Sequence, residues 1–209
     1  MTKEQVQQMK LLNKNCELLL KRCAKTYHLK KKLDCLWTEK DGMICILAMF
    51  VSMGKEQPEL RVRALVKPIW LDHLLWDIMD MPQHKTEPLS THVVGAFTLL
   101  GAPMTEEQIP VNGFSVPVLE HLMTEKTEEF ADSLPAYTEE AYFEKLDSGM
   151  QVQQGDMMRV LNAIHRGDAK RARALLARKS LASYSGGTED FRKQALKWLD
   201  KPERAAGKA

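Results

Sequence analysis

The chain has 209 residues, of which 44% are hydrophobic, so it can bury a substantial core without disulfide staples. It opens on a polar stretch rich in Lys and Gln, without an apolar signal region. No apolar run approaches the roughly 20 residues that a membrane-spanning helix needs. These features argue against a secreted or membrane protein, and we expect a cytoplasmic one.

Charge is distributed unevenly along the chain, although the net charge is only +2. Residues 1–32 contain nine Lys or Arg and two Asp or Glu, giving +7. Residues 33–150 contain eight Lys or Arg and twenty Asp or Glu, giving −12. Residues 151–209 contain thirteen Lys or Arg and six Asp or Glu, giving +7. The basic ends either attract the acidic middle within the fold or form a basic surface for an anionic partner.

Residues 3–27 show the periodicity of an amphipathic helix. Its apolar stripe consists of Met9, Leu12, Cys16, Leu19 and Cys23, widened by Leu11, Leu18 and Leu20. Only about three heptads are sustained, which is short for a coiled coil. We therefore expect a helix laid across a sheet rather than a dimerisation seam.

The stretch from Leu33 to Val66 predicts a three-stranded antiparallel meander, around which the rest of the chain is organised. Residues 43–51, in its middle, are apolar at every position, as in a strand that is covered on both faces. The Asp41-Gly42 pair just before this segment is a strong hairpin signal, because both residues tolerate a positive φ.

The length of the Asp-Gly loop decides the register of this hairpin. A two-residue loop would pair Trp37 with Ile46 and put Cys35 and Cys45 on opposite faces. A three-residue loop would reverse that arrangement.

The third strand, from Leu60 to Lys67, alternates apolar and basic residues and ends at Pro68, which has no N–H to donate. Its apolar positions share one face, so the basic positions occupy a face that we expect to be at least partly wet. Together with a histidine of the next helix, the basic residues are candidates for lining a groove: Arg61, Arg63, Lys67 and His73.

After the meander, helical spacing predicts a helix from Ile69 to Asp80, and residues 82–88 then form a connecting loop. The run Val93–Leu100 is rich in β-branched and aromatic residues, which favours a fourth strand. From residue 115 the pattern is helical. The expected helices, with their capping residues, are Ser115–Ser133, Thr138–Asp147, Asp156–His165, Asp168 to about Leu181, and Thr188–Leu199.

No catalytic or cofactor motif stands out in the sequence. The six histidines show no HExxH or HxH spacing, and neither a Gly-rich phosphate loop nor GxSxG is present. His73, with Asp77 four residues on, is the candidate acid–base pair, although a surface ion pair on a helix explains it more simply. The four cysteines lack CxxC spacing, so we expect reduced, buried thiols and neither a metal nor a cofactor.

Two basic segments are candidates for contacts with phosphates or another anion. Their residues are Lys30, Lys31 and Lys32 near one end of the chain and Arg166, Lys170 and Arg173 near the other. Aromatic residues are not interleaved with these charges in the sequence, which favours a solvated basic face.

The order of expected elements over residues 3–80 resembles that of a group of uncharacterised bacterial proteins of unknown function. In that group a Lys-Lys segment, here within Lys30–Lys32, leads into a hairpin with an aromatic residue in its first strand, here Trp37. The resemblance covers about a third of the chain. It implies an α+β domain and brings no activity or site residues with it.

The sequence thus predicts an α+β fold with an N-terminal helix, a three- or four-stranded antiparallel meander and a helical C-terminal half. Residues 1–110 would form the sheet domain, residues 111–200 a helical region packed on it, and residues 201–209 a frayed tail. The leading functional hypothesis is a non-enzymatic interaction or adaptor protein whose partner is another protein, in an oligomeric state that the sequence does not specify. The alternatives are a nucleic-acid-binding protein and an enzyme of unidentified class.

Overall fold

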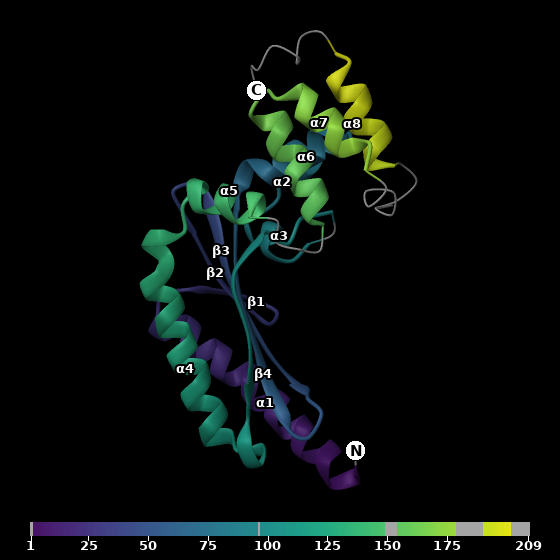
Figure 1. The fold of residues 1–209 in the computed structure, drawn as a ribbon. Coiled ribbons are helices and arrows are strands. Elements are labelled where there is room, and N and C mark those ends of the chain that lie inside the picture. Colours follow the sequence, from purple (N-terminus) through teal and green to yellow (C-terminus); the bar gives the residue numbers. More distant parts are fainter. Residues whose placement is uncertain (1, 96, 149–153, 179–189, 202–209) are drawn as a thin grey trace. The chain divides into compact units, whose positions relative to one another are not determined.

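The computed structural model describes residues 2–95, 97–148, 154–178 and 190–201 (Figure 1). The chain forms two compact units that interleave along the sequence. Unit 1 comprises Met1–Val66 and Pro103–Ala141, and unit 2 comprises Lys67–Ala102 and Tyr142–Ala209. The predicted regions 1–110 and 111–200 follow chain order instead, and the predicted tail lies outside the described residues except for Lys201.

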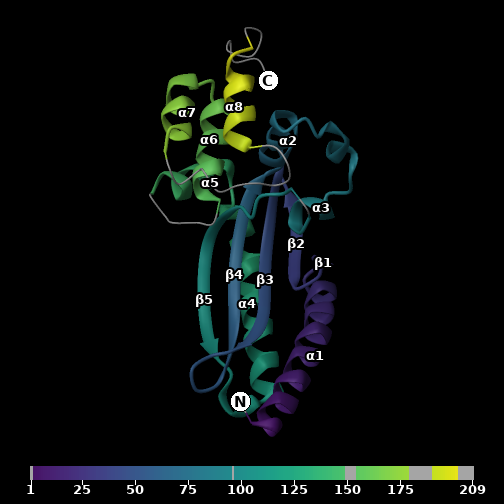
Figure 2. The same ribbon diagram turned by 90° about the vertical axis from the view of Figure 1, so that its right-hand side faces the viewer.

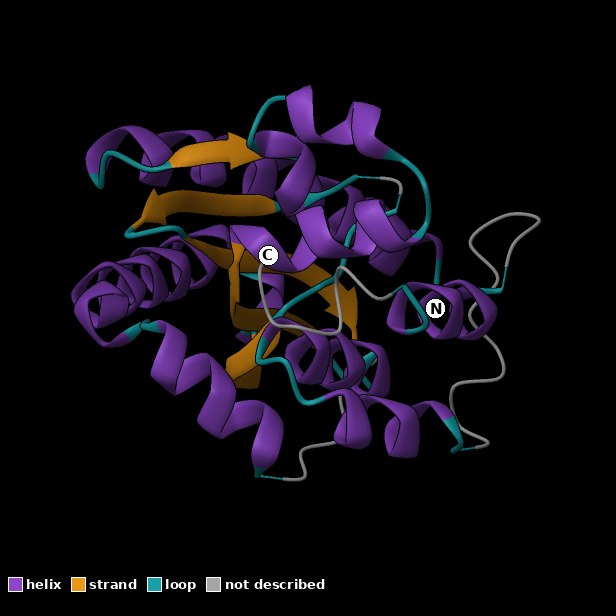
Figure 3. Cartoon of the chain, turned by 90° about the horizontal axis from the view of Figure 1, so that it is seen from above, coloured by secondary structure: helices purple, strands orange, loops and turns teal. Residues whose placement is uncertain are grey.

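Five strands form an antiparallel sheet in the order β1-β2-β3-β4-β5, which confirms the predicted α+β fold. Figure 3 shows the strands of the sheet in orange among the purple helices. The strands are β1 (Lys30–Lys32), β2 (Cys35–Lys40), β3 (Met43–Met53), β4 (Pro58–Pro68) and β5 (Ala102–Pro110). The predicted meander corresponds to β2, β3 and β4. The lysine segment adds a short strand at one edge, and β5 adds a long strand at the other.

The β2–β3 hairpin has the two-residue Asp41-Gly42 loop. Both loop residues have positive φ, 51° and 76°, as a type I′ turn requires. Trp37 pairs with Ile46, which confirms the register expected for this loop length. Cys35 and Cys45 therefore lie on opposite faces of the sheet, and all four cysteines of the chain are free.

The apolar segment of β3 is covered on both faces only over its first half. Leu47 lies beside Phe130, a residue of a helix that packs on β3, so the odd-numbered positions of β3 face that helix. Residues 43–47 are all buried, whereas Phe50, on the opposite face, is 42% exposed. The prediction of complete coverage over residues 43–51 is therefore wrong for the second half of the strand.

Two long helices cover one face of the sheet in unit 1: α1 (Lys3–Thr26) and α4 (Val116–Ser133). Each begins at a capped residue, Thr2 through a capping box with Gln5, and Ser115 through its hydroxyl. Both helices have the predicted bounds to within a residue. Figure 2 shows β3, β4 and β5 in front of α4, with no helix of unit 1 crossing their near face.

Unit 2 is built mainly from helices, and short 3-10 turns connect elements of both units. The helices with residues in unit 2 are α2 (Ile69–Ile78), α3 (Ser90–Val93), α5 (Glu139–Asp147), α6 (Gly155–His165), α7 (Ala169–Leu176) and α8 (Phe191–Leu199). The 3-10 turns are η1 (Pro82–Thr86), η2 (Asn112–Phe114) and η3 (Leu134–Ala136).

Three helix boundaries in unit 2 differ from the prediction. Helix α2 ends at Ile78 rather than at Asp80. Helix α7 ends at Leu176 rather than near Leu181. Asp190 caps α8 by accepting from Arg192 N, and the predicted cap Thr188 lies outside the described residues.

The expected fourth strand at residues 93–100 does not form. Val93 ends helix α3, Phe97 has a left-handed φ of 64°, and residues 98–100 have no regular structure. The main chain of Leu99 instead donates to and accepts from two buried side chains of unit 2. These tertiary hydrogen bonds replace the ladder that local β propensity predicts.

Candidate functional site

The most concentrated group of buried titratable side chains in unit 2 consists of Lys67, Asp72 and His92. Lys67 comes from the end of β4, Asp72 from the first turn of α2, and His92 from the short helix α3. Lys67 has no exposed surface, so its predicted place on a wet strand face is wrong. The alternation of the sequence correctly places Lys67 on the same face of β4 as Arg61 and Arg63. Of these three residues, only Arg61 and Arg63 reach solvent.

The Asp72 carboxylate is the centre of this cluster. Its Oδ2 accepts from Lys67 Nζ at 2.7 Å and lies 2.8 Å from His92 Nδ1. Its Oδ1 accepts from the Leu99 N–H at 2.9 Å, while Lys67 Nζ also donates to the Leu99 carbonyl. The cluster therefore fastens the chain after α3 to the start of α2.

Burial and charge act in opposite directions on the two ions of this cluster. Burial lowers the pKa of Lys67, and the Asp72 carboxylate opposes this effect only in part. Burial by itself would raise the pKa of Asp72, but the Lys67 charge and the hydrogen bonds from His92, Leu99 and Lys67 outweigh it and lower that pKa. Asp72 is consequently ionised at neutral pH.

A ring cluster surrounds His92. The His92 ring lies 4.9 Å from that of Trp76 and 5.3 Å from that of His73, measured between centroids. Trp76 Nε1 donates to the Phe97 carbonyl at 2.8 Å, which holds the same segment as the Leu99 hydrogen bonds. Trp76 thus gives the residues after α3 a second attachment to α2.

His73, the predicted acid–base candidate, is half-buried beside this cluster. Burial is the largest effect that lowers the pKa of His73, and electrostatic interactions with His92 and Lys85 lower it further. Asp77 is the carboxylate that the sequence predicts to orient His73. It forms an ion pair with Lys85 instead, at 2.5 Å.

The chemistry open to the Lys67–Asp72–His92 cluster is limited by access. An acid, a base and an orienting carboxylate are present, but a reaction needs a substrate within hydrogen-bond distance of the acid or base. The three side chains are between 0% and 2% exposed, and their hydrogen bonds are made within unit 2. The arrangement stabilises the fold of unit 2.

The four predicted groove residues belong to different units. Arg61 and Arg63 lie in unit 1, where Arg61 Nε donates to Ser52 Oγ at 2.8 Å and Arg63 pairs with Glu106 at 2.5 Å. Lys67 and His73 lie in unit 2. The groove itself stays a prediction.

The basic residues near the N-terminus form the edge strand β1. Lys30 is exposed, and its Nζ lies 4.7 Å from the centre of the Trp37 ring, within cation–π range. Short strands and lysines are common at sheet edges, where they discourage pairing with other chains. Edge protection therefore accounts for the Lys30–Lys32 segment without a ligand.

The basic residues of the C-terminal region lie on the α6–α7 hairpin of unit 2. Arg166 lies over the Phe143 ring at 4.0 Å, and Arg173 pairs with Asp200 at 2.7 Å. Lys170 is exposed and forms no ion pair with the described residues. Next to Arg166, the His165 ring stacks on Trp70 with centroids 3.8 Å apart.

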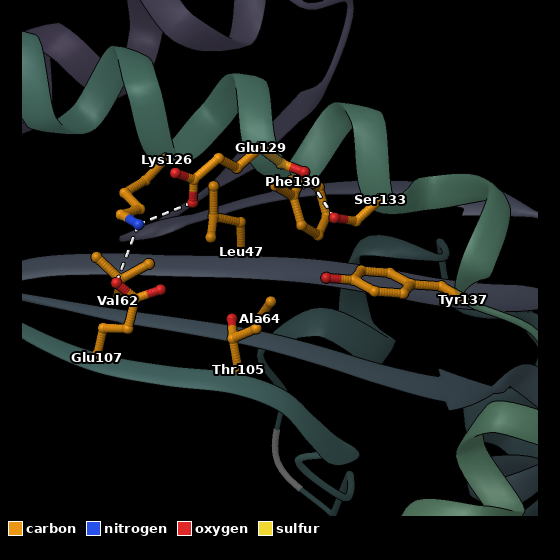
Figure 4. Close-up of a pocket in the computed structure, with 10 residues that line it drawn as sticks. All are labelled: Leu47, Val62, Ala64, Thr105, Glu107, Lys126, Glu129, Phe130, Ser133 and Tyr137. Carbon is orange, nitrogen blue, oxygen red and sulfur yellow. Dashed lines mark hydrogen bonds and ion pairs between the residues drawn. The ribbon is translucent and has the colours of Figure 1, made fainter.

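A small pocket lies in unit 1 between α4 and the sheet (Figure 4). Lys126 stands at one end and bridges Glu107 and Glu129 at 3.0 and 2.8 Å, and Tyr137 stands at the other. Its volume of about 50 Å³ admits at most a few water molecules. It is too small for a substrate or cofactor.

A larger cavity lies in unit 2, beside the basic residues of the C-terminal region. It has a volume of about 370 Å³ and is lined in part by Arg159, Arg171 and Arg178. The signal in the sequence was the density of arginines over residues 159–178. Their convergence depends on the packing of α5, α6 and α7.

Among the described residues, no three His, Cys, Asp or Glu side chains are placed to hold a metal ion. Within the same part of the chain, no helix has the length and apolarity needed to cross a membrane. No known protein family, curated protein or solved structure matches the chain.

Proposed function

We propose that this chain is a non-enzymatic interaction or adaptor protein of the cytoplasm that binds another protein through the outer face of the sheet in unit 1. The four free cysteines, three of them buried, are compatible with a reducing compartment. The observation that carries the proposal is Phe50, a large aromatic side chain left 42% exposed on a strand face that α1 and α4 do not cover.

Arginines accompany Phe50 on this face. Arg61 forms a hydrogen bond with Ser52, which lies two residues after Phe50 on β3. Arg63 lies two residues after Arg61 on β4. Arg61 Nε donates to the neutral Ser52 hydroxyl, so the charge of Arg61 is available to a carboxylate. Aromatic and Arg side chains are the residue types enriched at the centres of protein interfaces. We therefore expect a partner surface that is apolar at its centre and acidic at its rim.

The buried cluster of unit 2 supports a non-enzymatic role. Its lysine, aspartate and histidine are bonded to one another and to Leu99, and they are closed to solvent. A catalytic group must reach its substrate, so these side chains serve the fold rather than a reaction.

The test is affinity capture from native cell extract at low salt, with wild-type protein, Phe50→Ala and the control Leu18→Ala as baits. Leu18 is also an exposed apolar residue of unit 1, but it lies on α1. We expect a partner that wild type and Leu18→Ala retain and that Phe50→Ala loses. Recovery of the wild type only as a lone monomer would overturn the proposal.

A specific observation favours nucleic-acid binding as the second candidate. The folded unit 2 brings aromatic rings next to basic side chains, as in the Arg166–Phe143 and His165–Trp70 pairs, although the sequence does not interleave them. Aromatic platforms beside cations bind single strands by stacking and by phosphate contacts. The exposed side chain of Lys170 adds a cation on the following helix.

A gel-mobility assay with single-stranded oligonucleotides across a salt series tests the second candidate. Phosphate contacts weaken steeply as salt rises, and Arg166→Ala with Lys170→Ala should abolish a shift that Lys10→Ala with Lys14→Ala preserves. Absence of any shift at low salt would remove this candidate.

A further inference from the structure

The cavity of unit 2 is formed by side chains of α5, α6 and α7. Leu146 and Asp147 come from the end of α5, Arg159 from α6, and Arg171 and Leu175 from α7. Its volume of about 370 Å³ falls within the range of small-molecule sites, which is roughly 300–1,000 Å³. It is therefore large enough for a ligand, unlike the pocket of unit 1.

Three guanidinium groups line this cavity. Arg159 is held firmly, with Nε donating to the Leu146 carbonyl at 3.0 Å and Nη1 donating to Asp156 at 3.1 Å. Arg171 pairs with Asp147 at 2.7 Å. Arg178 reaches the Asp156 carboxylate only at 3.8 Å and is 58% exposed. Among the described residues, Arg178 therefore has the longest ion pair of the three guanidinium groups.

The existing pairs would not prevent an anion from entering. Arg171 and Asp147 are each more than 40% exposed, and an exposed ion pair contributes only about 0–1 kcal/mol. A ligand oxyanion can therefore replace Asp147 as the partner of Arg171 at small cost. Guanidinium groups bind phosphate or carboxylate oxygens in a bidentate manner, which adds geometric selectivity.

The wall between these charges is apolar. Leu146 and Leu175 belong to the core of unit 2, and both line the cavity. Leu146 is 0% exposed and Leu175 is 5% exposed, so neither presents much surface to water, whereas Ala174 lines the same cavity and is exposed. A ligand with an apolar body beside its oxyanion would cover the exposed Ala174 side chain and gain the free energy of that burial.

We propose that this cavity binds a small organic anion, with Arg171 and Arg178 holding its phosphate or carboxylate group and the apolar lining at Ala174 contacting its apolar body. The site is separate from the sheet face of unit 1. The test of this ligand site is therefore independent of the test of the proposed interaction function.

The probes for the test are phenyl phosphate, benzoate, inorganic phosphate and phenol, titrated into the full-length protein and followed by calorimetry and by NMR. We expect phenyl phosphate or benzoate to bind at least tenfold more tightly than inorganic phosphate or phenol. Arg171→Ala and Arg178→Ala should each weaken binding about fivefold or more. The hydrogen bond from Arg192 to the Arg178 carbonyl involves the main chain, so Arg178→Ala leaves it in place.

Two further variants separate a built site from general electrostatics. Asp147→Asn removes the anion that competes for Arg171, and it should tighten binding about twofold to fivefold. Arg173→Ala, on the same helix but bonded to Asp200, should leave binding unchanged.

Failure of both phenyl phosphate and benzoate to bind at millimolar concentration would overturn the proposal. Equal weakening by Arg173→Ala would also overturn it, because the effect would then be one of net charge. If a single-stranded oligonucleotide displaces the probe and loses affinity in Arg178→Ala, the cavity is part of a nucleic-acid surface and the small-ligand proposal falls.

Discussion

At the scale of single residues, the buried pair of Lys67 and Asp72 has the largest energetic consequences. Removing two ions from water is expensive, and mutual attraction repays this only where further hydrogen bonds satisfy both groups. Here each oxygen of Asp72 has a partner, and Lys67 also donates to the main chain of Leu99. Loss of one member therefore leaves the other as an uncompensated buried group.

The two members of this pair are expected to differ in their effect on stability. Asp72→Asn leaves the Lys67 ammonium buried without a counter-charge and should lower the free energy of unfolding by about 3–5 kcal/mol. Lys67→Met keeps an apolar stem and leaves Asp72 bonded to His92 and Leu99, so its loss should be smaller. Urea unfolding of both variants and of the double variant measures this.

The double variant serves as the control for that comparison. Because the two residues interact directly, its loss should be less than the sum of the single losses. Strictly additive losses, or equal losses in the two single variants, would contradict the ion-pair interpretation.

The pKa of Asp72 also predicts how stability depends on pH. This pKa is lower in the folded protein than in the unfolded chain, so the unfolded state takes up the proton first as pH falls. The contribution of Asp72 is present above the ordinary carboxyl pKa of about 4 and is lost as pH falls below it towards the folded value. Urea midpoints measured from pH 7 to pH 3 should fall less steeply in Asp72→Asn than in wild type. Parallel curves would show that Asp72 does not carry this dependence.

At the scale of elements, the β2–β3 hairpin follows directly from its loop residues. Asp41 and Gly42 adopt positive φ values, which Asp tolerates and which Gly, without a Cβ, adopts freely, and the register follows from a loop of two residues. Residues 93–100 show the opposite case. Their β-branched and aromatic composition favours a strand, but a hydrogen bond to Asp72 and hydrogen bonds from Lys67 and Trp76 hold the backbone in another path.

Substitution of Gly42 tests the energetics of the hairpin. A Cβ there would meet no atom within 4 Å, so the penalty comes from backbone conformation alone. Gly42→Ala should cost about 1–2 kcal/mol, the price of a left-handed residue that carries a side chain. Gly42→Asn should cost less, because Asn tolerates this region. Equal urea midpoints for the two variants would contradict a type I′ turn in solution.

At the scale of the whole molecule, the chain leaves unit 1 at the end of β4 and returns to it along β5. After this return, α4 covers the sheet and contacts α1, with Cys23 donating to the Met123 carbonyl and Arg22 pairing with Glu120. Unit 1 is therefore incomplete until about residue 141, although its five strands end at Pro110.

Truncation tests this organisation. A fragment of residues 1–110 lacks α4 and leaves the apolar face that Leu119, Met123 and Phe130 normally cover exposed, so it should aggregate or unfold without cooperativity. A fragment of residues 1–141 retains all of unit 1 and should protect the amides of β3 from hydrogen exchange. Cooperative unfolding of the shorter fragment, with the stability of the longer one, would show that the sheet folds without α4.

The sequence by itself determined the local features of this protein. These are the helices at residues 3–26 and 116–133 with their caps, the Asp-Gly turn with its register, and the strand face that Arg61 and Arg63 share. These features depend on residues a few positions apart, whose periodicity and turn chemistry can be read along the chain. Tertiary structure alone decided the burial of Lys67, the loss of the strand at residues 93–100, the arginine cavity and the interleaving of the two units. Each of these depends on partners many residues away, because a charged side chain becomes stable in a core only when a distant group satisfies it.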